Sequence, residues 1–592
     1  MVSFLNWAKG ILVGALNGMA KIALAVILIV ILFALIGLTH GDGMPGKMVL
    51  TADLRSKLAD SSPDSPLGLG NRKLAIMDLV LALDRAGRDD RVKGLFIRVG
   101  DAGVSVAEAE EVGAAIQRFR KTGKFVIAHA QGFDSTGLGD YLMAASADQI
   151  WMQPQGVFSS AGSGAGAVFL RGFFDKIQAT PQIAKRADYK SAADMFMEKD
   201  YTAADREQTT ALLQSWYSTA AAGAAADRKL GIGAVEAAFD ASPQFASDAK
   251  SKGLIDKIGF DDEAKEAAIA RAGGNAKTKP LNEYAHATEQ SSDFGSGAHV
   301  ALVEASGEIV DGTAGNNVFD GNAVIAGDDY AQAIRQATKD KDIKAILIRV
   351  DSPGGSVSAS DQILDAVKKA QAAGKPVVVS MGNLAASGGY YISCSANRIV
   401  AEPATLTGSI GVLTGKVAVG KSLGLIGVTA DEIGVGKNAL FDSAITPYTD
   451  DQWKALNNQA DVIYGDFMHK VAAGRKLPFE KVQEIAKGRV WTGADAHQRG
   501  LVDELGNFWT AVDAVKKLAK IAPDTRVIFE HYPRPHSIFE TLGAAFDSSA
   551  ASIRVLQGVS ILANTPAIHS VIEAVSMAPR GGVALQATGL PQ

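Results

Sequence analysis

One serine of the chain lies between two glycines, in a setting that could present its hydroxyl group to a substrate. It is Ser409, in the stretch TLTGSIGV at residues 405–412. Flanking glycines let the backbone turn sharply and leave room for a carbonyl group beside the hydroxyl. A serine used as a nucleophile needs a base to accept its proton. Because no histidine or acidic residue is close in the sequence, the base must come from elsewhere in the chain.

Histidines are poor candidates for this base. His129 falls in a predicted strand, His469 and His497 fall in predicted helices, and the others lie in connecting or terminal segments. None of them stands at a turn that follows a predicted strand. A Ser-His-Asp triad is therefore poorly supported.

A buried lysine can serve instead of a histidine. Burial that lowers the lysine pKa from ~10.4 by roughly 2 to 3 units leaves the amine neutral near pH 7 and able to accept a proton. Two lysines are candidates from the sequence: Lys190 in RADYKSAADMF and Lys437 in GVGKNALFD.

A glycine pair could supply the complementary electrophilic site. Gly354 and Gly355 follow a predicted strand in the stretch RVDSPGGSVS. Paired glycines at this place let backbone N–H groups face outward at the start of a helix, as an oxyanion hole requires. We expect neither a metal nor a cofactor at this site.

The elements that carry these residues occur twice in the chain. Residues 92–124 align without a gap on residues 343–375, with ten of the 33 positions identical. The match resumes at ASADQI against CSANRI and at GLIDKIG against GLVDELG. In this alignment Ser160 corresponds to Ser409, and Val104 replaces Gly355. Two copies of one domain explain the pattern most simply.

Each copy alternates predicted strands and helices. In the second copy, AILIRV and KPVVVSM are predicted strands, and ASDQILDAVKKAQAAG between them has helical periodicity. This alternation predicts an α/β fold with parallel strands, built of repeated β-β-α units.

An apolar segment precedes both copies. Ile22 to Leu38 is a run of 17 uncharged residues, preceded by Lys9 and Lys21. This length is at the short end of what spans a bilayer. We expect a single-pass anchor with the N-terminus in the cytoplasm and the catalytic body across the membrane, which is the periplasm if the source is a Gram-negative bacterium.

The expected organisation has five parts. They are the N-terminal segment and anchor (1–45), the first copy (46–272), a polar linker (273–299), the second copy (300–533) and a possibly helical tail (534–592).

Composition excludes some functions. A net charge of −5 over 592 residues offers no broad basic surface, so we expect no nucleic-acid partner. The single cysteine, Cys394, excludes an intramolecular disulfide framework and lies in an apolar run typical of a buried side chain.

Several stretches together resemble a known family. DSPGGSVSAS, NLAASGGYYIS, TLTGSIGV, DYKSA and GRVWTGADAHQRGLVDELG, behind an N-terminal anchor, are similar to the long two-domain form of the signal peptide peptidase A (protease IV) family. That family belongs to the Clp protease and crotonase-like superfamily and uses a Ser/Lys dyad. The resemblance extends from the anchor to about Lys520.

The resemblance implies roles for individual residues. Ser409 would be the nucleophile, and Lys190 would be the general base that reaches across from the other copy. Gly355 and the backbone N–H of Ser409 would be the oxyanion donors. Lys437 stays an alternative base, because short members of the family take the lysine from the same domain as the serine.

The resemblance also implies a membrane-anchored serine endopeptidase of the bacterial cytoplasmic membrane that degrades cleaved signal peptides and other apolar peptides. A homotetramer and the absence of a cofactor follow from it in the same way. Two alternatives remain at this point: a crotonase-like acyl-CoA enzyme, and a non-catalytic scaffold tethered to the membrane.

Overall fold

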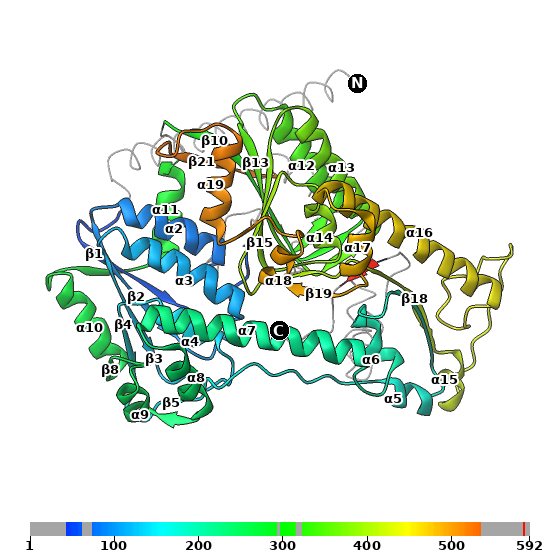
Figure 1. The fold of residues 1–592 in the computed structure, drawn as a ribbon, viewed down its shortest axis with the longest axis horizontal. Helices are drawn as coiled ribbons and strands as arrows, with labels where there is room; N and C mark the ends of the chain where they lie inside the picture. The colour runs from blue at the N-terminus through cyan, green and yellow to red at the C-terminus, as the bar shows by residue number, and fades with distance from the viewer. Residues whose placement is uncertain (1–42, 62–73, 293–295, 315–322, 534–583, 587–592) are drawn as a thin grey trace, which may run out of the picture.

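A computed structural model describes residues 43–61, 74–292, 296–314, 323–533 and 584–586, and it contains two α/β units side by side (Figure 1). The expected anchor at 22–38 lies outside the described residues, as does the tail apart from residues 584–586. Within the described ranges, no helix is both long enough and apolar enough to cross a membrane.

The first copy contains a six-stranded sheet whose neighbouring strands are all parallel. In spatial order its strands are β8 (Lys257–Ile258), β4 (Gln149–Met152), β3 (Phe125–Ala130), β2 (Val92–Val99), β1 (Met48–Asp53) and β9 (Lys277–Pro280).

Helices cover both faces of this first sheet. On one face lie α2 (Ile76–Arg88), α3 (Val106–Arg120) and α4 (Gly139–Ala145), and on the other lies α10 (Asp261–Arg271). A small two-stranded antiparallel sheet is formed by β5 (Val157–Phe158) and β7 (Gln244–Phe245), with α8 (Ile232–Asp240) and α9 (Ala246–Ser251) beside it at the bottom of Figure 1.

The second copy repeats this arrangement in an eight-stranded sheet. Its strands are β19 (Val490–Thr492), β17 (Leu406–Gly408), β15 (Val377–Ala386), β13 (Ala345–Ser352), β10 (Ala298–Ser306) and β21 (Val527–Tyr532), with β16 (Arg398–Ala401) and β20 (Glu504–Leu505) branching from β15. Its helices include α12 (Gly327–Lys339), α13 (Val357–Ala372), α14 (Gly388–Ser393), α18 (Gly493–Gln498) and α19 (Phe508–Leu518).

The structure confirms the duplication that the sequence predicts. α3 and α13 begin 251 positions apart, and each follows a serine N-cap, Ser105 or Ser356. Each cap hydroxyl accepts a hydrogen bond from the backbone N–H three residues later, which satisfies one of the free donors of the first helical turn. The same sequence pattern therefore produces the same strand-turn-helix unit in both copies.

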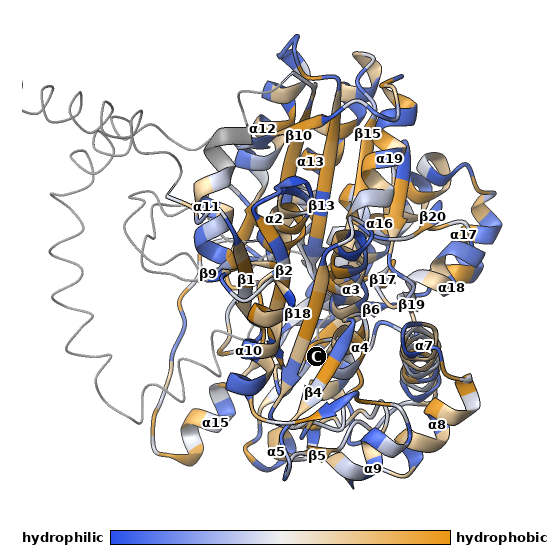
Figure 2. Ribbon diagram, turned by 90° about the vertical axis from the view of Figure 1, so that its left-hand side faces the viewer, coloured by the Kyte–Doolittle hydropathy of each residue, from blue (hydrophilic) through white to orange (hydrophobic). Residues whose placement is uncertain are grey.

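The two copies share one hydrophobic core. One face of the second sheet, which carries Leu302, Leu347 and Val378, packs with the helices of the first copy and with α19. Strands β10, β13 and β15 are hydrophobic along most of their length in Figure 2, as expected for strands covered on both faces. The copies are therefore joined by apolar packing as well as by the chain between them.

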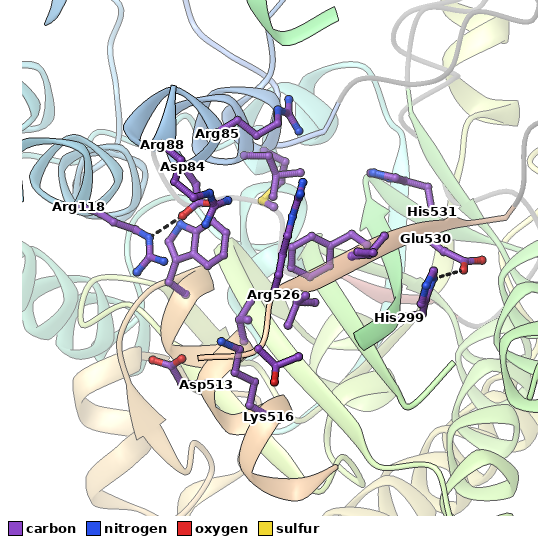
Figure 3. Close-up of a pocket in the computed structure, with 18 of the residues that line it drawn as sticks. Asp84, Arg85, Arg88, Arg118, His299, Asp513, Lys516, Arg526, Glu530 and His531 are labelled. Atoms are coloured by element: carbon purple, nitrogen blue, oxygen red, sulfur yellow. Dashed lines mark hydrogen bonds and ion pairs between the residues drawn. The ribbon is translucent and has the colours of Figure 1, made fainter. Parts of the chain in front are cut away.

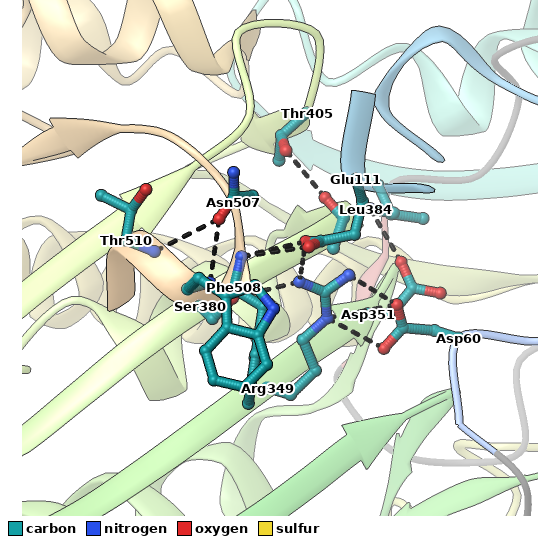
Figure 4. A network of polar contacts seen from close by, with 12 residues as sticks. Asp60, Glu111, Arg349, Asp351, Ser380, Leu384, Thr405, Asn507, Phe508 and Thr510 are labelled. Atoms are coloured by element: carbon teal, nitrogen blue, oxygen red, sulfur yellow. Dashed lines mark hydrogen bonds and ion pairs between the residues drawn. The ribbon is translucent and has the colours of Figure 1, made fainter. Parts of the chain in front are cut away.

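A buried ionic network also joins the copies (Figure 4). The guanidinium of Arg349 on β13 is 2.8 Å from Asp60 and 2.7 Å from Glu111, both of the first copy. Ser380 Oγ accepts a further hydrogen bond from Arg349 at 3.0 Å. Burial and the nearby Asp60 carboxylate raise the pKa of Asp351 to about 7. Because these charges are buried, the loss of any one side chain would leave an unpaired charge in the interior and destabilise the fold.

The segment 273–299, predicted as a linker, is largely regular structure, so this prediction needs correction. Its strand β9 extends the first sheet beside β1, and helix α11 (Leu281–Ser292) packs on α2. The buried positions of α11 recur with helical spacing at Leu281, Tyr284, Ala285 and Thr288. The polar composition of the rest of the segment concealed this apolar stripe.

A third, mixed sheet carries a strand from the first copy into the second. Its strands in spatial order are β12 (Val324–Ala326), β11 (Glu308–Val310), β14 (Gly354–Ser356), β22 (Ala584–Gln586), β18 (Val412–Ala418) and β6 (Thr180–Arg186). Helices α5 (Arg171–Lys176), α6 (Asp194–Met197) and α16 (Asp450–Arg475) contact β6, and α15 (Gly420–Leu425) follows β18. Helix α7 (Ala203–Arg228) contacts α4 and β19, α17 (Phe479–Ile485) contacts α16, and a 3₁₀ turn covers Ser191–Ala193.

Candidate active site

The amine of Lys190 lies in the interior, between two serines of the second copy. Its Nζ is 2.8 Å from Ser387 Oγ, 2.9 Å from Ser409 Oγ and 3.1 Å from the backbone oxygen of Ser409. Lys190 is 1% exposed, and both serines are buried. The structure thus brings together Lys190 and Ser409, which the sequence places 219 positions apart, and adds Ser387.

Strand β6 delivers Lys190 to the second copy. It pairs antiparallel with β18 over seven residue pairs, from Val412 opposite Arg186 to Ala418 opposite Thr180. Lys190 follows β6 by four residues, and Ser409 precedes β18 by three. The strand pairing therefore brings the segments that carry the amine and the hydroxyl to the same end of the sheet.

A close approach between two loops completes the placement of Lys190. The Tyr189 N–H donates to the Lys487 carbonyl at 3.1 Å. Gly488, with φ +73°, lies so close that a Cβ there would be 2.6 Å from Lys190 Cβ. Only glycine fits this position, which explains the glycine of the GRVWTG stretch.

Burial changes the acidity of Lys190. Removal of the amine from water lowers its pKa from 10.5 to about 7, because the charged form loses its hydration and no carboxylate replaces it. This shift corresponds to roughly 5 kcal/mol of free energy that disfavours protonation. The amine is therefore substantially neutral near pH 7, as a general base requires.

The number of neighbours also suits a neutral amine. A neutral lysine has two N–H donors and one lone pair, whereas the ammonium form has three donors and no acceptor. The Ser409 carbonyl can only accept, so one N–H points to it. Of the two hydroxyls, one can then accept the second N–H while the other donates its proton to the lone pair. The serine that donates is the one that becomes a nucleophile.

Ser387 lies on a sharp strand-to-helix turn. It follows β15 directly and is the N-cap of α14, with φ 55° and ψ −114°. Its N–H donates to the Gly408 carbonyl at 2.9 Å, which ties this turn to the Ser409 loop. In α/β-hydrolases, a strained turn between a strand and a helix presents a serine hydroxyl at the end of a sheet.

No role for Ser387 was predicted from the sequence. Two signals were present in NLAASGGYYIS: the serine directly precedes a predicted helix, and the first copy has Leu138 at the start of the corresponding helix α4.

The predicted glycine pair lies beside this turn. Gly354 and Gly355 have φ angles of 108° and 148°, which side chains rarely adopt. A Cβ on Gly388, the residue after Ser387, would be 3.0 Å from the nitrogen of Gly355. The first N–H groups of a helix have no acceptor within the helix, so the Gly388 N–H is available beside the glycine pair. Gly355 and Gly388 therefore lie next to each other at the turn that carries Ser387.

The Ser409 N–H, by contrast, already has an acceptor, and its predicted role as an oxyanion donor does not fit the structure. It donates to the Arg489 carbonyl at 2.8 Å. Ser409 lies between β17 and β18, with a φ angle of 50°. Because its N–H is used to anchor the 487–489 loop, it is not free to bind a developing oxyanion.

Lys437, the alternative base, lies far from this chemistry. Its side chain is 76% exposed and forms an ion pair with Asp451 at 2.9 Å. The structure therefore favours Lys190 over Lys437.

The corresponding turn of the first copy is closed. The Asp140 carboxylate accepts hydrogen bonds from the N–H groups of Ala102 and Gly103, at 3.2 and 3.1 Å. These donors correspond to the glycine-pair region of the second copy, so an acid occupies the place of an oxyanion. Ser160 is buried with no partner for its hydroxyl. The first copy therefore contributes a lysine to the second copy's site and has no such site of its own.

Other features do not form part of this site. A pocket of about 810 Å³ lies between α2, α19 and β21 and contains neither the lysine nor the two serines (Figure 3). Its wall mixes positive and negative side chains, for example Arg118 paired with Asp84 at 2.9 Å.

Cys394 is buried, and burial raises its thiol pKa to about 11. Across the described ranges, no cluster of three or more His, Cys, Asp or Glu could hold a metal.

Comparisons with known proteins agree with this geometry. The model of peptidase family S49 matches residues 118–274 and 369–522, just over half of the chain, and the Clp protease model matches residues 326–405. "Protease 4" of Salmonella typhi is 33% identical over 88% of this chain and 82% of its own length.

Two further relatives belong to other groups of organisms. "Serine protease SPPA, chloroplastic" of Arabidopsis thaliana is 31% identical over 86% of this chain and 75% of its own length. "Putative signal peptide peptidase SppA" of Enterococcus faecium is 31% identical over 34% of this chain and 59% of its own length.

Proposed function

The chain belongs to peptidase family S49 and is a serine peptidase, and we propose that Ser387 is its nucleophile, Lys190 its general base and Ser409 the residue that positions the base. The observation that carries this proposal is the buried amine of Lys190, within 2.9 Å of both hydroxyls. It keeps the predicted base and transfers the predicted nucleophile role from Ser409 to Ser387.

Three features favour Ser387 over Ser409 as the nucleophile. Ser387 has the strand-turn-helix setting of a nucleophilic serine, and the next residue, Gly388, lies beside the Gly355 nitrogen. Ser409 binds the amine through both its hydroxyl and its carbonyl, an arrangement that holds a base in place. Its N–H is also already used by Arg489.

The reaction follows from these positions. Ser387 Oγ attacks the carbonyl carbon of a peptide bond while its proton passes to Lys190 Nζ. The backbone N–H groups of Gly355 and Gly388 stabilise the resulting oxyanion. Lys190 then gives the proton to the leaving amine, the C–N bond breaks, and an acyl ester on Ser387 remains. A water molecule gives a proton to Lys190 and attacks the ester carbon, the bond between that carbon and Ser387 Oγ breaks, and Lys190 returns the proton to Ser387 Oγ.

The proposed substrates are signal peptides and other apolar peptides in extended conformation. The name of a bacterial relative supports this choice, and so does β14 beside Ser387, whose edge already pairs with an extended segment of this chain, β22. The proposed setting is the bacterial cytoplasmic membrane, with the anchor at 22–38, a periplasmic catalytic body and a homotetrameric assembly.

The two alternative functions, an acyl-CoA enzyme and a non-catalytic scaffold, are set aside, because the matching family and the relatives of this chain are proteases.

Labelling with a fluorophosphonate tests the assignment. The nucleophilic serine oxygen attacks the phosphorus of the probe and displaces fluoride, and peptide mapping by mass spectrometry identifies the phosphonylated serine. We expect the label on Ser387, no label and no casein hydrolysis in Ser387→Ala or Lys190→Ala, and normal activity in the matched control Ser160→Ala.

The variant Ser409→Ala separates positioning from nucleophilic attack. It should keep the label on Ser387 while its hydrolysis rate falls roughly ten- to a hundredfold, and the pH at which its rate is half-maximal should move. A label found on Ser409 in the wild type would refute the assignment and restore the prediction from the sequence.

A further inference from the structure

A strand from the end of the chain lies in the third sheet next to the active site. Strand β22, residues Ala584–Gln586, pairs antiparallel with β14: Gln586 is opposite Gly354, and Leu585 is opposite Gly355. On its other side β22 pairs with β18, where Ala584 is opposite Leu413. β22 is the short red strand in Figure 1.

The strand fills a gap that is one strand wide. In the order of this sheet, β14 and β18 are neighbours of β22 and are not paired with each other. Without β22, both would present unpaired backbone N–H and C=O groups to the space between them. Two facing strand edges form a slot for an extended peptide, which binds there through main-chain hydrogen bonds.

The slot lies at the catalytic groups. One wall contains Gly355, proposed above as an oxyanion donor, and the other begins three residues after Ser409. The edge of β18 that faces away from the slot pairs with β6, and Lys190 follows the end of β6 by four residues. A peptide that lies in this slot therefore passes the nucleophile, the base and the oxyanion donors.

We propose that residues 584–586 occupy the peptide-binding slot as a ligand supplied by the chain itself, so that a substrate must displace them to bind. The inference rests on the proposed function for the identity of the slot. A tethered ligand acts at an effective concentration in the millimolar range. A weakly bound strand can therefore still lower the apparent affinity for external peptides roughly tenfold.

Peptide binding to the full-length protein tests this proposal. The probe is a fluorescein-labelled peptide with the sequence of residues 581–590, GGVALQATGL, measured by fluorescence polarisation. All proteins carry Ser387→Ala, and mass spectrometry confirms that the probe stays intact. Leu585→Pro removes a backbone donor and disfavours strand pairing. Thr588→Pro, two positions beyond the strand, is the matched control.

We expect Leu585→Pro to bind the probe roughly tenfold more tightly than the parent protein, while Thr588→Pro binds like the parent. Ala584→Pro should repeat the effect, and all variants should unfold at the same temperature as the parent. Equal probe affinity in all four proteins, or no binding to any of them, would overturn the proposal, and so would weaker binding by Leu585→Pro.

Hydrolysis by the enzyme with Ser387 intact separates the two proposals. If that enzyme cleaves casein but Leu585→Pro does not gain probe affinity, the strand is not a competing ligand and the proposed function stands. If Leu585→Pro binds the probe more tightly but the enzyme with Ser387 intact cleaves no peptide, the proposal that residues 584–586 occupy the slot is supported and the proposed function fails.

Discussion

Replacement of Lys190 by methionine should make the protein more stable at neutral pH while abolishing its activity. Methionine has a similar shape, no charge and no need for hydration. A pKa lowered from 10.5 to about 7 means that the folded protein disfavours the ammonium form by roughly 5 kcal/mol. The variant avoids this cost but leaves two serine hydroxyls without the amine, a loss of about 1 kcal/mol each. The net gain near pH 7 is therefore about 2 to 3 kcal/mol.

The pH dependence of this gain follows from linkage. The unfolded lysine binds a proton up to about pH 10.5, whereas the folded one releases it near pH 7. Between these values the wild type therefore becomes more stable as pH rises, by up to about 1.4 kcal/mol per pH unit. The advantage of Lys190→Met is largest below about pH 7, shrinks as pH rises and reverses near about pH 9, where the remaining cost of the buried amine equals the loss of the two hydrogen bonds.

Urea unfolding followed by tryptophan fluorescence at several pH values measures this difference. The matched control is Lys437→Met, which removes an exposed amine and should change the unfolding free energy by less than about 0.5 kcal/mol at every pH. A wild type more stable than Lys190→Met at pH 7, with a gap that does not vary with pH, would show that the amine is not desolvated in the folded protein. The reasoning about the base would then fail.

Two further predictions concern the support of the site. Arg349→Met leaves buried carboxylates without their cation and should lower the unfolding free energy by about 3 to 5 kcal/mol, measured by thermal unfolding. Arg398→Met, at a half-exposed ion pair, should cost less than about 1 kcal/mol, and equal losses in both variants would contradict the importance of burial. Gly388→Ala places a Cβ 3.0 Å from the Gly355 nitrogen and should lower kcat at least roughly tenfold. Gly465→Ala meets no atom within 4 Å and should leave peptide hydrolysis unchanged, so a loss of activity in it would argue against a local effect.

Much of the fold could be predicted from local patterns. The repeat of residues 92–124 at 343–375 predicted two α/β units, because the same sequence signals produce the same strand, turn and helix wherever they occur. The glycine pair Gly354-Gly355 was recognisable for a similar reason, since positive φ angles demand glycine. Helix α11 was missed because its four buried positions are spread through a polar segment.

The sequence by itself determined the duplication and made a lysine a better candidate base than any of its histidines. Only the tertiary structure decided which hydroxyls meet the amine, because that depends on the pairing of β6 with β18 across the two copies. It also decided that the Ser409 N–H is occupied and that Ser387 lies on the strained turn. Burial, which lowers the pKa of Lys190, comes from segments far apart in the chain, so no local pattern of residues could have shown it.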